Sequence, residues 1–400
     1  MAGYELAGEL ALTGSLRPVS GALPLALRCR EAGRTAILPE INAAEGALVG
    51  EGRVLAAAHL LDVCDHLAGR RTLSVAAPVA RSTGERIPDL ADVRGQQQAR
   101  RCLEIAAAGG HSLLLSGPPG TGKSMLAARL PGILPPMSDA ESLETAAVAS
   151  VSDGGFDPGR WGIRAFRRPP LGVPHGPHRW WRQTQTREIS LAHNGVLFLD
   201  ELPEFSRRAL EMLREPLETG AVEIARAAAR VRYPARFQLV AAMNPCPCGQ
   251  LGDPAGECRC SPEQIARYQA RISGPLLDRI DLFCEVRRLA ATELRSAARG
   301  EDSASVRARV VTARERQRRR DGVAAASLAT DALERACALD AEASQLLEAA
   351  CERLRLSARG YHRCLRVART IADLAGSEAV TAAHVAEAVS YRERRQGADY

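Results

Sequence analysis

Residues 117–124 read Gly-Pro-Pro-Gly-Thr-Gly-Lys-Ser. This stretch matches the pattern G-x-x-x-x-G-K-[ST], in which the backbone N–H groups of a glycine-rich loop surround the phosphates of a nucleotide. A short apolar run, 111–116, comes before the loop, and the helix-forming residues 125–130 follow it. Strand, glycine loop and helix in this order form the context that a phosphate loop needs. The stretch therefore predicts an α/β fold with a site for a nucleoside triphosphate.

Lys123 is the only lysine in a chain of 400 residues, and arginine fills the other 52 of the 53 strongly basic positions. A compact ammonium group on a flexible stem reaches the β- and γ-phosphates, whereas a planar guanidinium prefers flat, bidentate partners. We therefore expect Lys123 to contact the phosphates and Ser124 to ligate Mg²⁺. The expected nucleotide-binding residues of the loop are Gly117, Gly120, Thr121, Gly122, Lys123 and Ser124.

A second apolar run, Val-Leu-Phe-Leu at 196–199, ends in Asp200 and Glu201. A fully apolar run is typical of a central strand in a parallel sheet, because both faces of such a strand are covered. We expect Asp200 to hold Mg²⁺, directly or through water, and Glu201 to orient and deprotonate the attacking water. The alternative is a strand that runs into an acidic turn without a catalytic role.

A third apolar stretch, 237–243, ends in Asn244, whose polar side chain is placed to sense the γ-phosphate and to help position the water. Further along the chain, Arg279 follows a turn within the stretch 274–281. An arginine supplied by a neighbouring subunit can neutralise charge in the transition state of phosphoryl transfer. A surface salt bridge is the alternative role for Arg279.

The order of five motifs resembles that of the magnesium-chelatase-like AAA+ ATPases of the YifB/ComM group. The motifs are GPPGTGKS, VLFLDEL, AAMNPCPCG, GPLLDRID and SARGYHRCLRVARTIADL, and the resemblance covers nearly the whole chain. It implies an AAA+ phosphate-loop domain, with a parallel sheet flanked by helices, and a helical C-terminal lid. It also implies that Asn244 is sensor 1, that Arg279 is the finger acting on a neighbour, and that Arg359, or else Arg363, is sensor 2. Because the finger acts in a neighbouring subunit, the resemblance implies a homo-oligomeric ring, a hexamer.

The same resemblance divides the chain into four parts. They are a partial Lon-protease-like α+β segment at 1–70, a linker at 71–89, the AAA+ ATPase core at 90–290, and the helical lid with the Mg-chelatase-type C-terminal domain at 291–400. The upstream portion of the Lon-like domain has no counterpart, so the sequence indicates an N-terminally truncated relative. Leu23 stands at the position of the protease lysine, and we therefore expect no Ser–Lys dyad.

Eleven cysteines without a recognisable secretion signal indicate reduced thiols or a metal site. Four of them form two C-x-C pairs with nine residues between the pairs: Cys246, Cys248, Cys258 and Cys260. Four thiolates in two close pairs can hold Zn²⁺ in a tetrahedral structural site, and unliganded reduced thiols are the alternative. The remaining seven are scattered and are expected to be small core residues: Cys29, Cys64, Cys102, Cys284, Cys337, Cys351 and Cys364.

Residues 168–187 depart from the family pattern although both flanks match it. Tryptophan has a single codon, so a shift of one base can turn Trp180-Trp181-Arg182 into a run of glycines. One interpretation is therefore a local shift of reading frame that is restored before Glu188. The other is real divergence, in which the two tryptophans stack on nucleic-acid bases.

The composition sets limits on partners and location. The formal charge of +6 is compatible with nucleic-acid contact and equally with a solvated, arginine-rich surface. The basic run at 307–320 likewise indicates either contact with nucleic acid or a solvated helix face. No apolar run approaches the ~18 residues of a membrane span. The start of the chain lacks the features of a signal peptide. We therefore expect a cytoplasmic protein without a membrane partner.

Two classes of function fit these observations, with ATP and Mg²⁺ as cofactors in both. The first is a ring ATPase that acts on DNA, for which the family resemblance implies branch migration during recombination. The second is a chelatase- or chaperone-type remodeller, which uses ATP to drive a protein partner or to insert Mg²⁺ into a porphyrin. A degraded, non-functional relative is a third interpretation, which the truncation and the divergent segment suggest.

Overall fold

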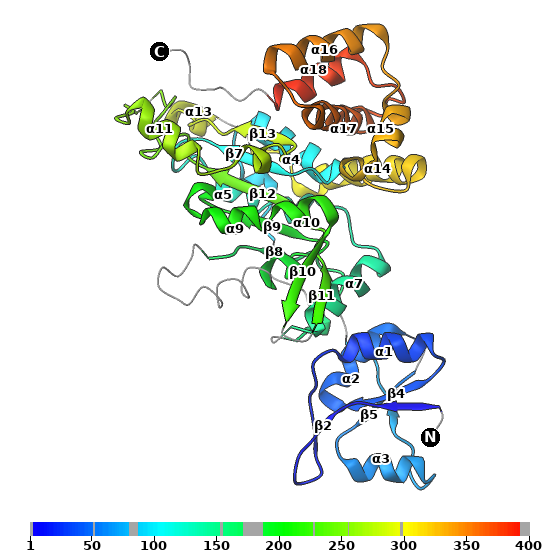
Figure 1. The fold of residues 1–400 in the computed structure, drawn as a ribbon. Helices are drawn as coiled ribbons and strands as arrows, with labels where there is room; N and C mark the ends of the chain where they lie inside the picture. The colour runs from blue at the N-terminus through cyan, green and yellow to red at the C-terminus, as the bar shows by residue number, and fades with distance from the viewer. Residues whose placement is uncertain are drawn as a thin grey trace. The chain divides into compact units, whose positions relative to one another are not determined.

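The computed structural model describes residues 3–50, 53–79, 87–152, 155–170, 187–226, 229–254, 256–296 and 299–392. Internal contacts divide the chain into two compact units (Figure 1). The smaller unit consists of Met1–Arg86 with Pro136–Ala165, and the larger of Ile87–Pro135 with Phe166–Tyr400. Each unit buries apolar clusters of its own.

A five-stranded parallel sheet organises the larger unit, with the strand order β13-β7-β12-β9-β8. Its strands are β7 (Leu113–Ser116), β8 (Phe166–Arg167), β9 (Val196–Leu199), β12 (Gln238–Met243) and β13 (Leu282–Glu285). Successive side chains point to opposite faces, so Leu113 and Leu115 join one buried cluster and Leu114 joins another. Burial of both faces explains why these strands are apolar throughout.

Helices cover both faces of this sheet. On one face, helices α4, α14 and α17 share a buried cluster with Leu113 and Phe198. On the other face, helices α9 to α12 surround Leu114 and Leu197. These helices are α4 (Gln97–Gly109), α9 (Arg207–Glu211), α10 (Arg214–Thr219), α11 (Pro262–Gln269), α12 (Gly274–Leu277), α14 (Ser303–Asp321) and α17 (Ala358–Ala375).

The C-terminal third is helical, and in Figure 1 α15 to α18 gather beside α14 at one end of the larger unit, whereas α13 lies near α11. Its further elements are α13 (Ala291–Ser296), η5 (Ala325–Ser327), α15 (Thr330–Cys337), α16 (Ala341–Leu354) and α18 (Ala382–Ser390). Helix α16 ends at Leu354 and α17 begins at Ala358, so Arg359 lies in the first turn of α17. Thr381 caps α18.

Short elements complete the larger unit. They are η2 (Leu90–Asp92), α5 (Lys123–Ala127), α6 (Leu130–Ile133), η4 (Leu202–Glu204), β10 (Ala221–Arg226) and β11 (Ala229–Pro234). Strands β10 and β11 pair antiparallel as a hairpin that is separate from the parallel sheet.

The smaller unit has a four-stranded sheet in the order β1-β4-β5-β6, in which only β6 is antiparallel to its neighbour. Helix α7 packs on α1 within this unit, and Leu23 of α1 is fully buried there. Leu23 is therefore a core residue of this unit. The elements are β1 (Tyr4–Leu6), β2 (Glu9–Leu10), β3 (Leu16–Arg17), α1 (Ala22–Glu31), β4 (Thr35–Pro39), α2 (Glu40–Gly46), η1 (Ala47–Val49), β5 (Val54–Ala57), α3 (Leu60–Leu67), β6 (Ser74–Val75), α7 (Asp139–Ser150) and η3 (Pro158–Arg160).

The structure confirms the expected α/β class, with a parallel sheet flanked by helices and a helical C-terminal region. The boundaries of the four sequence-derived parts stay predictions, although β6 lies within the expected linker and 136–165 packs with the smaller unit. Most of the divergent segment, 171–186, lies outside the described residues, and so do Trp180, Trp181 and the arginines beside them. Within the described ranges, no helix has both the length and the apolar composition needed to cross a membrane.

Candidate active site

The phosphate loop leaves the C-terminal end of β7 and enters α5, as the sequence predicts. Gly117 is packed so closely that an added Cβ would lie 2.1 Å from the carbonyl oxygen of Val286, the residue after β13. Gly120 and Gly122 adopt φ values of 77° and 90°, which favour glycine because a Cβ there is strained. Close packing therefore requires glycine at 117, and the backbone conformation of the loop favours glycine at 120 and 122.

The ammonium group of Lys123 is held by three oxygen atoms. Its Nζ donates to the carbonyl oxygens of Gly117 and Pro118 at 2.6 and 2.8 Å, and to Oδ1 of Asn244 at 3.1 Å. Burial lowers the pKa of Lys123, and the nearby carboxylates of Asp200 and Glu201 oppose that shift. Lys123, the first residue of α5, and Asn244, the residue after β12, are thus direct neighbours although they are 121 residues apart in sequence.

Asp200 and Ser124 also meet, as expected for two ligands of one Mg²⁺. The Ser124 hydroxyl donates to Oδ2 of Asp200 at 2.8 Å. Glu201 follows with φ 53° and ψ 50°, a left-handed conformation that is rare for a residue with a side chain. Such conformations cluster at functional sites, where the surrounding structure maintains them. Glu201 is exposed at this edge of the sheet, which leaves its carboxylate accessible to water.

Arg168 is a residue of this site that the sequence did not reveal. Its guanidinium donates to Oδ2 of Asp200 at 2.6 Å and lies 5.6 Å from the ring centroid of Phe198. Arg168 directly follows β8, but a strand of two residues has no apolar run that could have marked its end. The guanidinium and the Ser124 hydroxyl therefore share one carboxylate oxygen.

Arg279 and Arg359 lie together and share one carboxylate, that of Glu218 at the end of α10. Arg279 is almost fully buried, pairs with Glu218, and donates to the carbonyl oxygen of Pro275 at 2.6 Å. Arg359 is exposed and lies 3.5 Å from the same Glu218 oxygen. In the described part of the chain, the polar contacts of both side chains are with this region rather than with Lys123 or Asp200.

Arg363, the alternative sensor, has a structural partner instead. It pairs with Asp281, whose carboxylate is almost completely buried and also accepts from the Ser112 N–H and hydroxyl at 2.9 and 2.8 Å. His111 Nδ1 lies 3.7 Å from Asp281, and its Nε2 is 2.7 Å from the hydroxyl of Thr370. This cluster joins the start of β7, the turn after Arg279 and helix α17. Because Arg363 is already paired within it, Arg359 is the stronger candidate for sensor 2.

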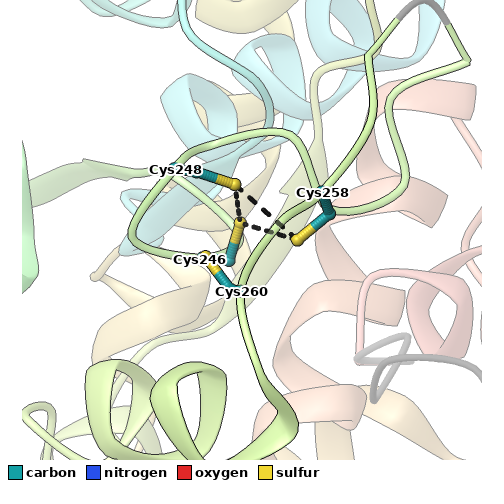
Figure 2. Close-up of side chains that lie close together, drawn as sticks. All are labelled: Cys246, Cys248, Cys258 and Cys260. Carbon is teal, nitrogen blue, oxygen red and sulfur yellow. Dashed lines mark hydrogen bonds between the residues drawn. The ribbon is translucent and has the colours of Figure 1, made fainter.

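The cysteine quartet forms a compact cluster after β12. The four Sγ atoms lie within 4.8 Å of one another, and Figure 2 shows the side chains converging from both arms of one loop. Sγ of Cys246 is 3.4 Å from that of Cys248 and 3.7 Å from that of Cys258. Hydrogen bonding by the backbone N–H of Gln250 is the main cause that lowers the pKa of Cys248 to about 6. Five of the other seven cysteines are buried and Cys351 is half-buried, but Cys64 is exposed, so the core expectation is wrong for Cys64.

The basic run at 307–320 bonds mainly to the protein itself. Arg309 pairs with Glu104 and Glu301, and Arg320 with Asp373. Arg307, Arg314 and Arg316 donate to the backbone carbonyl oxygens of Gly132, of Ala107 and Ala108, and of Asp373. These contacts favour a structural role for the run over contact with nucleic acid.

The fold and this site define a phosphate-loop protein of the AAA+ class. Residues 89–294 match the family model of the magnesium chelatase subunit ChlI, and residues 300–392 match the model of its C-terminal region. The chain therefore belongs to the magnesium-chelatase-like AAA+ family, in its YifB/ComM group.

Relatives from several bacteria support this assignment. The chain is 46% identical over 399 residues to the uncharacterized protein YifB of Salmonella typhimurium, and 46% identical over 401 residues to the competence protein ComM of Haemophilus influenzae. Both alignments cover 97% of this chain and 77% of the relative. An uncharacterized protein of Mycobacterium tuberculosis is 43% identical over 400 residues, which cover 97% of this chain and 78% of that protein.

We predict that Asp281→Asn destabilises the protein by about 3–5 kcal/mol at pH 7, because Arg363 then loses its buried partner. Burial opposes ionisation of Asp281, but His111, Arg363 and the Ser112 N–H outweigh it and hold the pKa of Asp281 well below its usual range. A lowered pKa contributes stability above the unfolded-state pKa of about 3.9, so the difference from wild type should shrink as the pH falls through about 4.

Urea unfolding at several pH values measures this difference. Glu352→Gln, at an exposed site on α16, serves as the control and should change the free energy of unfolding by less than about 0.5 kcal/mol. A difference between wild type and Asp281→Asn that stays constant with pH would contradict the role given to the buried carboxylate.

Proposed function

We propose that this chain is an ATP-hydrolysing, ring-forming motor that acts on DNA during recombination or branch migration. One observation supports the ATPase part of this proposal. Two pairs of side chains meet at the carboxyl ends of three adjacent parallel strands: Lys123 with Asn244, and Ser124 with Asp200. Ligands of open α/β sheets bind at that edge. Similarity to a relative named as a competence protein supports the DNA part.

In this mechanism the β- and γ-phosphate oxygens replace the loop carbonyls as partners of the Lys123 ammonium. Ser124 and Asp200 would hold Mg²⁺, which would supply positive charge to neutralise the phosphates. Glu201 orients the attacking water and takes its proton, and Asn244 holds the γ-phosphate in place. Arg168 now contacts Oδ2 of Asp200, and it would have to give up this contact if a metal used that oxygen.

Arg279 and Arg359 serve the site of a neighbouring subunit. They share Glu218 in their own chain, while their own phosphate loop uses other partners. This arrangement supports a homo-oligomer, for which a hexameric ring is the proposed form. The proposal also includes a cytoplasmic location, ATP and Mg²⁺ as cofactors, and a structural Zn²⁺ held by the four clustered thiolates.

We predict that Lys123→Ala abolishes ATP binding, and that Glu201→Gln binds ATP but hydrolyses it at least about a hundredfold more slowly, because the water loses its base. Binding of a fluorescent ATP analogue and phosphate release measure the two effects. Arg335→Ala, at an exposed position on α15, is the control and should match wild type. Turnover at the wild-type rate in Glu201→Gln would contradict the assignment.

We also predict that two inactive variants complement each other when they are mixed. Lys123→Ala subunits cannot bind ATP but keep Arg279, whereas Arg279→Ala subunits bind ATP but lack the finger. A random ring pairs an intact phosphate loop with an intact finger at about a quarter of its sites, so about a quarter of the wild-type rate should return. Arg359→Ala, at an exposed position, is expected to complement Lys123→Ala in the same way. Mixed rings without activity would show that the arginines act within their own chain.

The substrate is tested by the ATPase rate with different additives. Branched DNA should raise the rate about tenfold, and added salt should weaken this effect because phosphate contacts release counterions. Single-stranded DNA, an unfolded protein and a porphyrin with Mg²⁺ serve as comparisons. Stimulation by the unfolded protein alone would contradict a DNA motor and favour a protein remodeller. Stimulation by the porphyrin alone would favour a chelatase.

A further inference from the structure

The cysteine cluster has the dimensions of a metal site. Four sulfur ligands at about 2.3 Å from a tetrahedral Zn²⁺ lie about 3.8 Å from one another. The Sγ atoms of Cys246, Cys248 and Cys258 are separated by 3.4, 3.7 and 3.7 Å, and Cys260 completes a set within 4.8 Å (Figure 2). The spacing therefore fits a structural zinc site with four thiolate ligands.

The loop that carries these cysteines begins at the nucleotide site. Asn244, which accepts from Lys123, stands only two residues before Cys246. Cys246 is fully buried, so the first ligand is anchored in the protein interior next to the end of β12. A metal that fixes Cys246 would also restrict the backbone that carries Asn244.

The loop also packs directly on the phosphate loop. Gly249, with φ 79°, lies so close that an added Cβ would be 2.7 Å from Cδ of Pro119 and 3.7 Å from Cγ of Asn244. Arg288 makes a second link, because its Nε donates to the buried carboxylate of Asp253 at 2.9 Å and its Nη2 to the Pro119 carbonyl oxygen at 3.4 Å. Two independent contacts thus connect the cysteine loop to the residues that surround the phosphates.

We propose that Cys246, Cys248, Cys258 and Cys260 bind one Zn²⁺, and that the metal-bound loop supports Pro119 and Asn244 in the geometry needed for ATP turnover. The support role rests on the proposed ATPase function, whereas the metal site does not. The cysteines are positioning residues in this proposal, since they would act on ATP turnover through Pro119 and Asn244. Loss of the metal should therefore lower kcat more than it weakens ATP binding.

The metal site is tested by elemental analysis of the purified full chain and by absorption spectra after exchange with Co²⁺. Wild type should carry about one Zn²⁺ per chain and give the thiolate-to-cobalt band of a tetrahedral site. Cys260→Ser should lose both signals, whereas Cys260→His, which restores a nitrogen ligand, should keep the metal. Cys64→Ser is the matched control, because Cys64 is an exposed cysteine outside the cluster. Wild-type protein that takes up neither metal overturns the site.

The support role is tested by kcat and by the affinity for an ATP analogue. Cys260→Ser should lower kcat at least about tenfold with a smaller change in affinity, and Cys260→His should restore it. Gly249→Ala should keep the zinc but lower kcat, because the new methyl group presses on Pro119. Gly252→Ala is the matched control, since it has a similar φ of 74° but nothing within 4 Å of the added Cβ.

The outcomes separate the two claims. Zinc in wild type together with unchanged kcat in Cys260→Ser and Gly249→Ala overturns the support role and leaves the ATPase intact. Zinc in a wild-type chain that neither binds nor hydrolyses ATP overturns the proposed function, and with it the support role, while the metal site stands.

Discussion

A buried ammonium group needs oxygen partners, and the three oxygens around Lys123 connect the phosphate loop to the sheet. Two of them belong to the loop that carries the lysine, and the third is Oδ1 of Asn244 on the neighbouring strand β12. The loop reaches this position because Gly117 allows the end of β7 to approach Val286 more closely than any side chain would permit. The nucleotide site therefore depends on close backbone packing between parallel strands as much as on its charged groups.

The main residues of the site could be predicted from apolar runs, because Asp200 and Asn244 directly follow such a run and Lys123 follows one after the glycine loop. The sequence assigns Lys123, Asp200 and Asn244 to one nucleotide and its Mg²⁺, which requires them to lie near one another, and the structure brings them together. The geometry fixes only their proximity, and their roles in catalysis belong to the proposed mechanism.

Other parts of the site could not be predicted, because they depend on packing between distant segments. Glu218 and Arg279 are 61 residues apart, and no motif marks Glu218 as the partner of two arginines. Arg168 follows a strand too short to recognise, and the buried cluster around Asp281 joins three separate elements. Sequence reasoning identified Arg279 and Arg359 through family resemblance, but their common carboxylate is visible only in three dimensions.

The shared carboxylate of Glu218 leaves an electrostatic imbalance. Two guanidinium groups face a single negative charge, so one positive charge remains without compensation within this trio. Arg279 is buried, and bulk solvent screens such an excess less effectively than it screens charge on an open surface. An incoming polyanion would supply the missing countercharge, and its attraction to this place would grow with the number of phosphate groups that it carries.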